Sequence, residues 1–263
     1  MAKSRVDQLL VERGLAESRS RAQALIMAGL VFAGERKVAK AGEMLAADAV
    51  LDVRGKDHPW VSRGGLKLDH GLAHFGIDVV GAVGLDVGSS TGGFTDVLLS
   101  RGSTKVYAVD VGTNQLAWKL RQDPRVVVHE QTNARALTAE HVPEPVDIIV
   151  CDASFISLAK VLDAALGFAR EGAHLVALVK PQFEAGRGEV GKGGVVRDPA
   201  VHARVCAEAA AWVASKGWRV LGVETSPITG PEGNVEFLLG AVRDAARPGS
   251  AEGPAAGLAS ESG

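Results

Sequence analysis

Two charged residues directly follow apolar stretches that are typical of buried strands. Asp152 comes after residues 146–151, and Lys180 comes after residues 174–179. In an open α/β sheet the carboxyl ends of the strands line the ligand crevice, so we expect both charges where a ligand binds. Taken singly, each is also explained as a surface charge or as half of an ion pair.

Glu236 and Lys67 complete a set of four. Glu236 lies at the start of the last strand candidate, 235–242, and an antiparallel course of that strand would bring it to the same sheet edge. Two lysines and two carboxylates around one crevice favour proton transfer and require no metal. Lys180 is the candidate base, since a neighbouring cation such as Lys67 favours its neutral form, although Asp152 and Glu236 oppose this.

A glycine-rich turn after the strand candidate 82–87 predicts a nucleotide-type binding site. Glycines let the chain turn sharply and let a ligand approach the N–H groups at the start of the next helix, 94–99. The spacing matches neither the dinucleotide fingerprint nor a P-loop. An acidic residue two positions before the first glycine suits a cationic ligand, and S-adenosylmethionine carries a sulfonium and an ammonium group. The residues predicted to hold it are Asp86, Gly88, Ser89, Ser90, Gly92, Gly93 and Phe94.

Three more residues are predicted to contact the cofactor. Asp110 ends the strand candidate 105–110, where a carboxylate can accept hydrogen bonds from both ribose hydroxyls. Asn133 follows the strand candidate 126–129 and is placed to reach an adenine edge, or else forms a turn. Asp152 is the third. The alternative is that the glycine turn closes a strand–helix unit and binds nothing.

The elements that must position these residues alternate between strand and helix over residues 66–246. This alternation predicts an α/β fold with a Rossmann-like, doubly wound sheet. The seven strand candidates are 82–87, 105–110, 126–129, 146–151, 174–179, 219–223 and 235–242.

Residues 1–57 are predicted to form a small α+β domain of their own. Helical periods cover residues 4–14 and 18–29, and short strands are expected at 30–32 and 49–53. A linker, 58–65, follows.

Basic residues concentrate in this first part of the chain. Residues 1–67 hold twelve Lys and Arg against eight Asp and Glu, or +4, so the remainder of a chain with net charge −2 carries −6. Binding of nucleic acid through overall basicity is therefore excluded, and a local surface for RNA phosphates is predicted. An ordinary solvated face is the alternative. The predicted RNA-binding residues are Arg5, Arg19, Arg21, Arg36, Lys37, Lys40 and Arg63.

The chain resembles the TlyA family, whose members join an alpha-L RNA-binding domain to a Rossmann-like S-adenosylmethionine domain related to the FtsJ-type ribose methyltransferases. The resemblance runs from Arg5 to Phe237. Its motifs are Trp60-Val61-Ser62-Arg63-Gly64, residues 86–94, Ser154-Phe155-Ile156-Ser157-Leu158, Val179-Lys180-Pro181-Gln182-Phe183-Glu184 and Gly193-Gly194-Val195-Val196. It implies a catalytic tetrad of Lys67, Asp152, Lys180 and Glu236.

The resemblance also implies a function. The expected activity is 2′-O-methylation of cytidine in ribosomal RNA, 16S, 23S or both, with S-adenosylmethionine as cofactor and the ribosomal RNA or its subunits, not DNA, as partner. One departure is His58-Pro59, where a described family member has Arg-Ala before Trp-Val. The alternatives are the hemolysin that an older family label suggests, a non-catalytic RNA-binding protein, and a methyltransferase for small molecules or proteins.

Composition indicates in which cellular compartment the protein is expected. No apolar run approaches the roughly 20 residues that cross a bilayer, and the N-terminus lacks the apolar core of a signal peptide. Two cysteines suggest neither a disulfide framework nor a metal site. We therefore expect a cytoplasmic protein.

The last residues, 247–263, are rich in Gly, Ala, Ser and Pro and are predicted to form a flexible tail. The sequence leaves the target nucleotide and the oligomeric state open.

Overall fold

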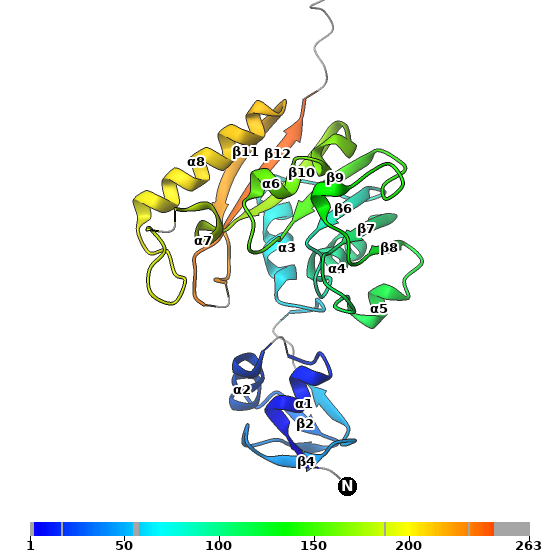
Figure 1. Ribbon diagram of the computed structural model, residues 1–263. Helices are drawn as coiled ribbons and strands as arrows, with labels where there is room; N and C mark the ends of the chain where they lie inside the picture. The colour runs from blue at the N-terminus through cyan, green and yellow to red at the C-terminus, as the bar shows by residue number, and fades with distance from the viewer. Residues whose placement is uncertain (1–2, 17, 55–57, 187, 231, 245–263) are drawn as a thin grey trace, which may run out of the picture.

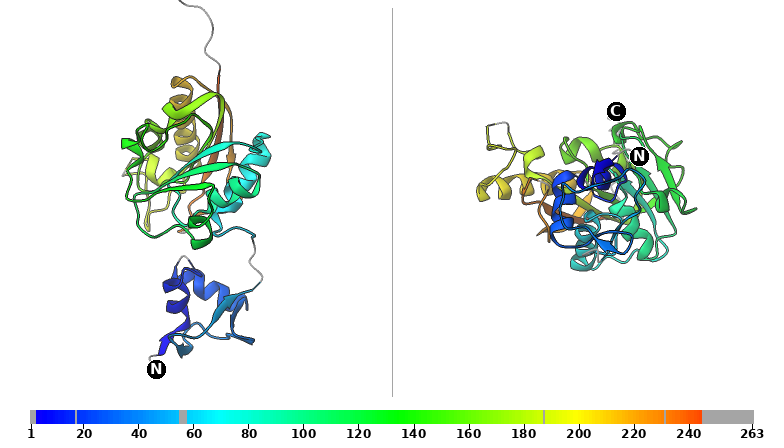
Figure 2. Two further views of the ribbon diagram at one scale, coloured as in Figure 1. Left: turned by 90° about the vertical axis from the view of Figure 1, so that its right-hand side faces the viewer. Right: turned by 90° about the horizontal axis from the view of Figure 1, so that it is seen from below.

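A computed structural model of the chain describes residues 3–16, 18–54, 58–186, 188–230 and 232–244. A small module with its own hydrophobic core precedes a larger sheet domain, as Figures 1 and 2 show. The domain boundary predicted at residue 57 and the tail predicted over 247–263 lie outside the described residues.

The small module has the predicted two helices packed against short strands. Val6, Leu10, Ala22 and Ile26 form its core together with Val31 from the first strand after the helices. Its elements are β1 (Lys3–Arg5), α1 (Val6–Glu12), α2 (Arg19–Met27), β2 (Val31–Ala33), β3 (Arg36–Lys37), β4 (Met44–Ala46) and β5 (Leu51–Val53).

The sequence predicts the start of α2 correctly but not the start of α1. The Ser18 hydroxyl accepts a hydrogen bond from the amide of Arg21 at 3.2 Å and caps α2, as predicted. The first helix, however, begins at Val6 and not at Ser4. Lys3–Arg5 instead pairs with Met44–Ala46 as a strand, a long-range contact that local periodicity does not reveal.

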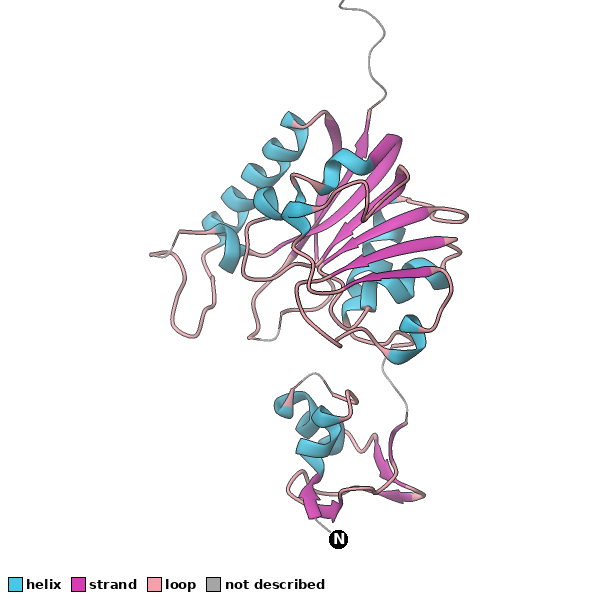
Figure 3. Ribbon diagram, turned by 45° about the vertical axis from the view of Figure 1, so that its right-hand side comes forward, coloured by secondary structure: helices cyan, strands magenta, loops and turns pink. Residues whose placement is uncertain are grey.

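The larger domain contains the predicted seven-stranded sheet, in the order β11-β12-β10-β9-β6-β7-β8. β12 runs antiparallel to both β10 and β11, while β10, β9, β6, β7 and β8 pair in this order as parallel strands. Figure 3 shows the twisted sheet with helices on its two faces. The strands are β6 (Val83–Val87), β7 (Lys105–Val109), β8 (Val126–His129), β9 (Val146–Cys151), β10 (Ala169–Val179), β11 (Trp218–Thr225) and β12 (Phe237–Arg243). The helices are α3 (Gly64–Phe75), α4 (Gly93–Ser100), α5 (Trp118–Arg121), α6 (Leu158–Leu162), α7 (Pro181–Glu184) and α8 (Pro199–Ser215), with short 3₁₀ turns at Ala134–Ala136 and Ala165–Phe168.

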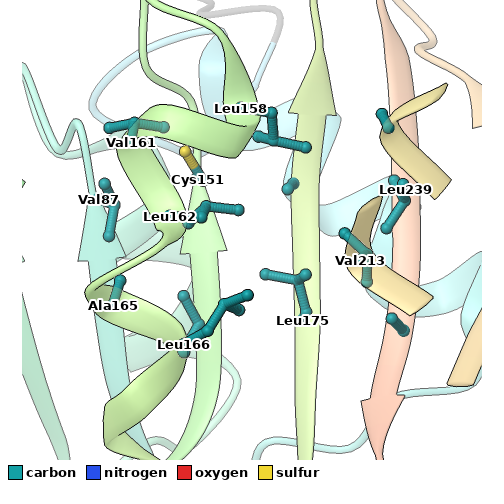
Figure 4. Close-up of a cluster of buried hydrophobic side chains, with 14 of the residues drawn as sticks. Val87, Cys151, Leu158, Val161, Leu162, Ala165, Leu166, Leu175, Val213 and Leu239 are labelled. Atoms are coloured by element: carbon teal, nitrogen blue, oxygen red, sulfur yellow. The ribbon is translucent and has the colours of Figure 1, made fainter. Parts of the chain in front are cut away.

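The central strands are apolar on both faces because both faces are covered. Ile149 and Cys151 of β9 belong to the cluster beneath α6 and α8, part of which Figure 4 shows. Ile148 and Val150 of the same strand belong to the cluster beneath α3 and α4. Because both faces of these strands are buried, their sequences are continuous hydrophobic runs. The sequence therefore predicts their positions well.

Two of the boundaries that differ from the sequence prediction are the starts of β10 and α3. β10 starts at Ala169 and not at His174, with a register irregularity between these residues. α3 starts at Gly64, so Gly64 and Gly65 form its first turn although the sequence placed them in the linker. A Cβ on Gly65 would lie 2.3 Å from the Trp60 side chain, and a glycine is therefore needed where the linker crosses the helix.

Candidate active site

The four charged residues predicted from the sequence meet at one edge of the sheet. Asp152 and Lys180 directly follow β9 and β10, and Glu236 directly precedes the antiparallel β12. Lys67 reaches this edge from the first turns of α3, and its Nζ lies 2.6 Å from Glu236 Oε2 and 3.6 Å from Asp152 Oδ2. Lys180 Nζ lies 2.6 Å from Asp152 Oδ1. We call these four residues the tetrad.

The tetrad is a buried chain of alternating charges. Lys67 is 6% exposed, Lys180 7% and Glu236 1%, whereas Asp152 is partly exposed. Burial disfavours the charge on Lys67, but the carboxylates of Asp152 and Glu236 together outweigh this effect and raise the pKa of Lys67 above its usual value. Lys67 is therefore a permanent cation at neutral pH.

Lys180 is held by one ion pair and two hydrogen bonds. Besides the ion pair with the Asp152 carboxylate, its Nζ donates to Ser154 Oγ at 2.9 Å and to the Asp152 carbonyl at 3.3 Å. These contacts fix the position of Nζ. Sequence reasoning did not assign Ser154 to the site, although its place two residues after Asp152 in the Ser154-Phe155-Ile156-Ser157 motif is a usable signal.

The glycine loop joins β6 to α4. Gly88 has φ +81° and Gly92, the residue before α4, has φ +94°, values that glycine adopts without strain. A Cβ on Gly93 would lie 2.4 Å from Ser62 Oγ and 3.0 Å from the backbone nitrogen of Gly65. The glycines therefore bring the starts of α3 and α4 together beside the tetrad.

Asp86 lies beneath this loop and is fully buried. Its Oδ2 accepts a hydrogen bond from Thr95 Oγ1 at 2.7 Å, and its Oδ1 has no hydrogen-bond partner among the described residues. Burial, with a smaller contribution from the Asp152 charge, raises the pKa of Asp86 to about 7. Asp86 thus supports the loop from below and does not line either cavity described below, in contrast to the direct cofactor contact that the sequence suggested.

The raised pKa of Asp86 predicts a pH-dependent stability. An unfolded Asp loses its proton near pH 3.9, whereas Asp86 keeps it up to about pH 7, so the folded state binds more protons between these values. The free energy of unfolding should therefore fall as the pH rises from about 4 to 7. Asp86→Asn should remove roughly 3 kcal/mol of this fall, measured by urea unfolding from pH 4 to 8. An unchanged pH profile would contradict the prediction, and Asp163→Asn on the exposed surface is the control.

Asp110 and Asn133 lie on the other side of the glycine loop. The Asp110 carboxylate accepts backbone hydrogen bonds from Ser90 at 2.8 Å and Gly112 at 2.7 Å. Asn133 Oδ1 accepts from the amide of Arg135 at 3.0 Å and caps a 3₁₀ turn. Both residues also line a cavity, so their turn-forming role and a ligand-binding role are compatible.

Two adjacent cavities open at this edge. The tetrad cavity, of about 440 Å³, is lined by Lys67, Lys180 and Glu236, among others. The Asp110 cavity, of about 480 Å³, is lined by Asp110 and Asn133, with apolar walls. The residues that line both cavities are Gly88, Ser90, Gln115, Asp152 and Ser154. Of the remaining predicted cofactor residues, Ser89, Gly93 and Phe94 line the tetrad cavity alone. Gly92 and Asp86 line neither cavity.

The linker is attached to this site. The amide of Val61 donates to Asp96 Oδ2 of α4 at 2.8 Å, and Lys119 pairs with the same carboxylate at 2.9 Å. Arg63 lines the tetrad cavity and donates to the carbonyl of Thr229 at 3.2 Å. Of the predicted RNA-binding residues, Arg63 is thus the one that lies at the tetrad. Asp96 was missed from the sequence because its partners are distant along the chain.

The other predicted RNA-binding residues lie on the small module. Arg5 and Arg19 both reach the buried carboxylate of Asp7, at 2.9 and 3.2 Å, and remain about half exposed. The Arg5 hydrogen bonds hold the pKa of Asp7 well below its usual range, against the opposing effect of burial. Arg36 pairs with Glu43 at 2.6 Å. Arg21 is half-buried, and Lys37 and Lys40 are exposed. The arginines therefore also hold the module together, a role that charge counting does not reveal.

Comparison with known proteins agrees with this architecture. Residues 60–243 match the family described as FtsJ-like methyltransferase, and residues 4–51 match the S4 domain. The chain is 52% identical, over 90% of its length and 89% of the relative's, to the 16S/23S rRNA (cytidine-2′-O)-methyltransferase TlyA of Mycobacterium tuberculosis.

Two further relatives carry provisional names. YqxC of Bacillus subtilis, named as an rRNA methyltransferase, is 51% identical over 90% of this chain and 85% of its own. A solved structure from Streptococcus thermophilus, titled as a hemolysin, is 44% identical and superimposes with a TM-score of 0.77, covering 93% of this chain and 90% of that one. No helix among the described residues is both long and apolar enough to span a membrane.

Proposed function

Because the chain belongs to the TlyA family of FtsJ-like methyltransferases, we propose that it transfers a methyl group from S-adenosylmethionine to the 2′-hydroxyl of a cytidine in ribosomal RNA, 16S, 23S or both. The observation that carries the proposal is the pair of cavities that share a wall at Asp152. A cofactor in one and a ribose in the other would meet at the tetrad.

The Asp110 cavity fits the cofactor in its chemistry. Asp110 offers a carboxylate to hydroxyl groups, Asn133 an amide to a base edge, and Val109, Val111 and Ile156 apolar walls to a flat ring. Asp152, at the shared wall, offers a negative charge to a cation. When bound, S-adenosylmethionine supplies an electrophilic methyl group on a sulfonium.

The tetrad then has the tasks of orienting a hydroxyl group and removing its proton. Lys180 Nζ is the proposed base, positioned by Asp152 and Ser154. Lys67 contacts the other oxygen of Asp152 at 3.6 Å, and Glu236 holds Lys67 in place at 2.6 Å. Burial of three of the four residues keeps water away from the reacting atoms.

Cofactor binding is tested by calorimetry with S-adenosylmethionine. Asp110→Ala should weaken binding by about 1–3 kcal/mol, because a charged hydrogen-bond acceptor is lost. Ser90 and Gly112 donate to different oxygens of Asp110, so Asp110→Asn keeps only one of these two backbone hydrogen bonds. The Tm of both variants is therefore compared with the affinity, to separate a loosened loop from a lost ligand contact. An affinity that is unchanged in both variants would contradict the assignment of Asp110. Mapping ribose methylation on ribosomal RNA with and without this gene identifies the nucleotide.

The small module is proposed to bind ribosomal RNA, and the activity is accordingly placed in the cytoplasm. Its match to the S4 domain and its exposed Lys37 and Lys40 support this assignment. The linker leads into α3, which carries Lys67 of the tetrad, and Val61 of the linker is bound to Asp96 of α4. Few residues of the chain therefore separate the module from the residues that line the tetrad cavity. A hemolysin, the alternative suggested by a relative's title, has no use for the tetrad.

Replacing Arg5, Arg19 and Arg21 together by Ala should lower RNA affinity and make it less dependent on salt. Each lost phosphate contact should reduce the slope of log K against log salt by about 0.7–0.9. Filter binding at several salt concentrations measures this effect, with calorimetry to confirm that cofactor binding is retained. Full RNA affinity in the triple variant would place the contact surface elsewhere.

The matched control is the triple Arg→Lys variant. It keeps the positive charge beside the buried carboxylate of Asp7, so it preserves the ion pairs that hold the module together. If the Lys variant retains RNA affinity while the Ala variant loses it, the charges act on phosphates. Circular dichroism of both variants reports whether the module is still folded.

A further inference from the structure

The structure assigns a metal-binding site to His70, His74 and Glu224, away from the tetrad. We propose that these three residues bind a divalent transition-metal ion of the zinc class. Among the described residues they are the one group of His, Cys, Asp or Glu side chains, three or more in number, whose ligand atoms lie within 4.8 Å of one another.

The two histidines share one side of α3. They are four residues apart, so successive turns of the helix place them above each other. His70 Nε2 lies 3.6 Å from Glu224 Oε1, and His74 Nε2 lies 3.7 Å from Glu224 Oε2. Both imidazoles therefore direct a nitrogen at one carboxylate. His70 Nε2 is buried and has no hydrogen-bond partner in the described part of the chain.

These separations fit a metal ion. Zinc binds imidazole nitrogen at about 2.0–2.1 Å and carboxylate oxygen at about 2.0–2.2 Å, so two ligands at the tetrahedral angle stand roughly 3.4 Å apart. The two His–Glu separations exceed that value by only a few tenths of an ångström. The ligand atoms of all three residues lie within 4.8 Å of one another, and both imidazole rings are partly exposed, so they can rotate to close the remaining distance. Three protein ligands and a water complete the coordination.

A β-bulge directs Glu224 toward α3. In β11, Val220 pairs with Ala241 and Gly222 pairs with Gly240, so Leu221 is an extra residue. Neighbouring residues of β12 point to opposite faces, and the bulge therefore moves the residues after it to the other face of the sheet. Trp218 and Val220 pack in the cluster beneath α8, whereas Gly222, two residues before Glu224, lies against Phe75 of α3.

Two glycines let α3 approach this edge of the sheet. A Cβ on Gly240 would lie 2.6 Å from the Phe75 ring, and one on Gly222 would lie 3.7 Å from it. Phe75 follows His74 directly, so the close contact of its ring also brings His74 to the strand. A bound ion would fasten α3, which carries Lys67 one turn before His70, to β11.

The test uses the full chain, freed of metal by a chelator and dialysed against buffered Zn²⁺. We expect one zinc per chain by mass spectrometry, visible absorption bands of a four-coordinate ion when Co²⁺ is used instead, and a rise in Tm of about 5–10 °C at a hundredfold excess over Kd. His70→Gln, His74→Gln and Glu224→Gln should each weaken Zn²⁺ binding at least tenfold.

His174→Gln, on β10, is the control for binding to an unrelated histidine and should bind zinc as the parent protein does. Metal-free Tm values verify that each variant is folded. The proposal is overturned if the triple variant of the three ligands binds zinc as tightly as the parent. It is also overturned if His174→Gln loses binding to the same extent, or if zinc leaves the Tm unchanged.

Discussion

Lys180→Ala is expected to lower the rate of methyl transfer by about 10²–10⁴-fold, while the protein still folds and binds S-adenosylmethionine. The reason is that Asp152 and Ser154, which line both cavities, hold Nζ of Lys180 in place in the tetrad cavity. The rate is measured in a single turnover at saturating cofactor, so that a change in binding is not mistaken for a change in chemistry.

Lys180→Arg is the more discriminating variant. Arginine keeps the charge and can still pair with Asp152, but it does not lose its proton, so it should not restore activity if Lys180 acts as a base. A rate close to that of the parent protein would instead make Lys180 a positioning cation. Proton removal would then pass to Asp152, Glu236 or water. Lys160→Ala, on the exposed side of α6, is the control and should leave the rate unchanged.

Glu236→Ala is expected to lower the free energy of unfolding of the sheet domain by about 3 kcal/mol, because it leaves a buried ammonium group without its nearest partner. Lys67 would keep only the Asp152 carboxylate at 3.6 Å in place of the Glu236 contact at 2.6 Å. All four tryptophans lie at positions 60, 118, 212 and 218, so tryptophan fluorescence in urea follows this domain and not the small module.

The double variant Lys67→Met, Glu236→Leu tests the cause of that loss. With both charges removed, the desolvation cost disappears, and stability should recover most of what Glu236→Ala loses. A double variant as unstable as the single one would show that shape, and not the uncompensated charge, is responsible. Glu236→Gln, which is nearly the same size, should fall between the parent and Glu236→Ala. Methyl transfer should be lost in the double variant, since Lys67 is part of the tetrad.

Much of the fold could be predicted from local pattern. β8 and β9 have the predicted bounds, and β6 and β7 differ from them by one residue at one end. Strands covered on both faces are continuous apolar runs, and this signal lies in the residues themselves. β10 differs most at its start, because Arg170, Glu171 and Gly172 are exposed and give no apolar signal, and of its first five residues only Ala169 pairs with β9.

Local pattern is enough to predict that Asp152, Lys180 and Glu236 meet at one edge of the sheet, because a charge directly after a buried strand, or before an antiparallel one, falls at the edge where ligands bind. What each of them touches depends on the folded chain. Lys67 and Glu236 are 169 positions apart and pair because β12 inserts between β10 and β11.

Asp86 and Arg5 show what charge and spacing do not reveal. Asp86 is fully buried beneath the glycine loop, and Arg5, a predicted RNA contact, also pairs with Asp7 while it remains partly exposed. Periodicity and spacing describe the chain over one or two turns, whereas burial and ion pairing depend on which distant segment covers a residue. The bulge at Leu221, which turns Glu224 toward α3, leaves no mark in local periodicity for the same reason.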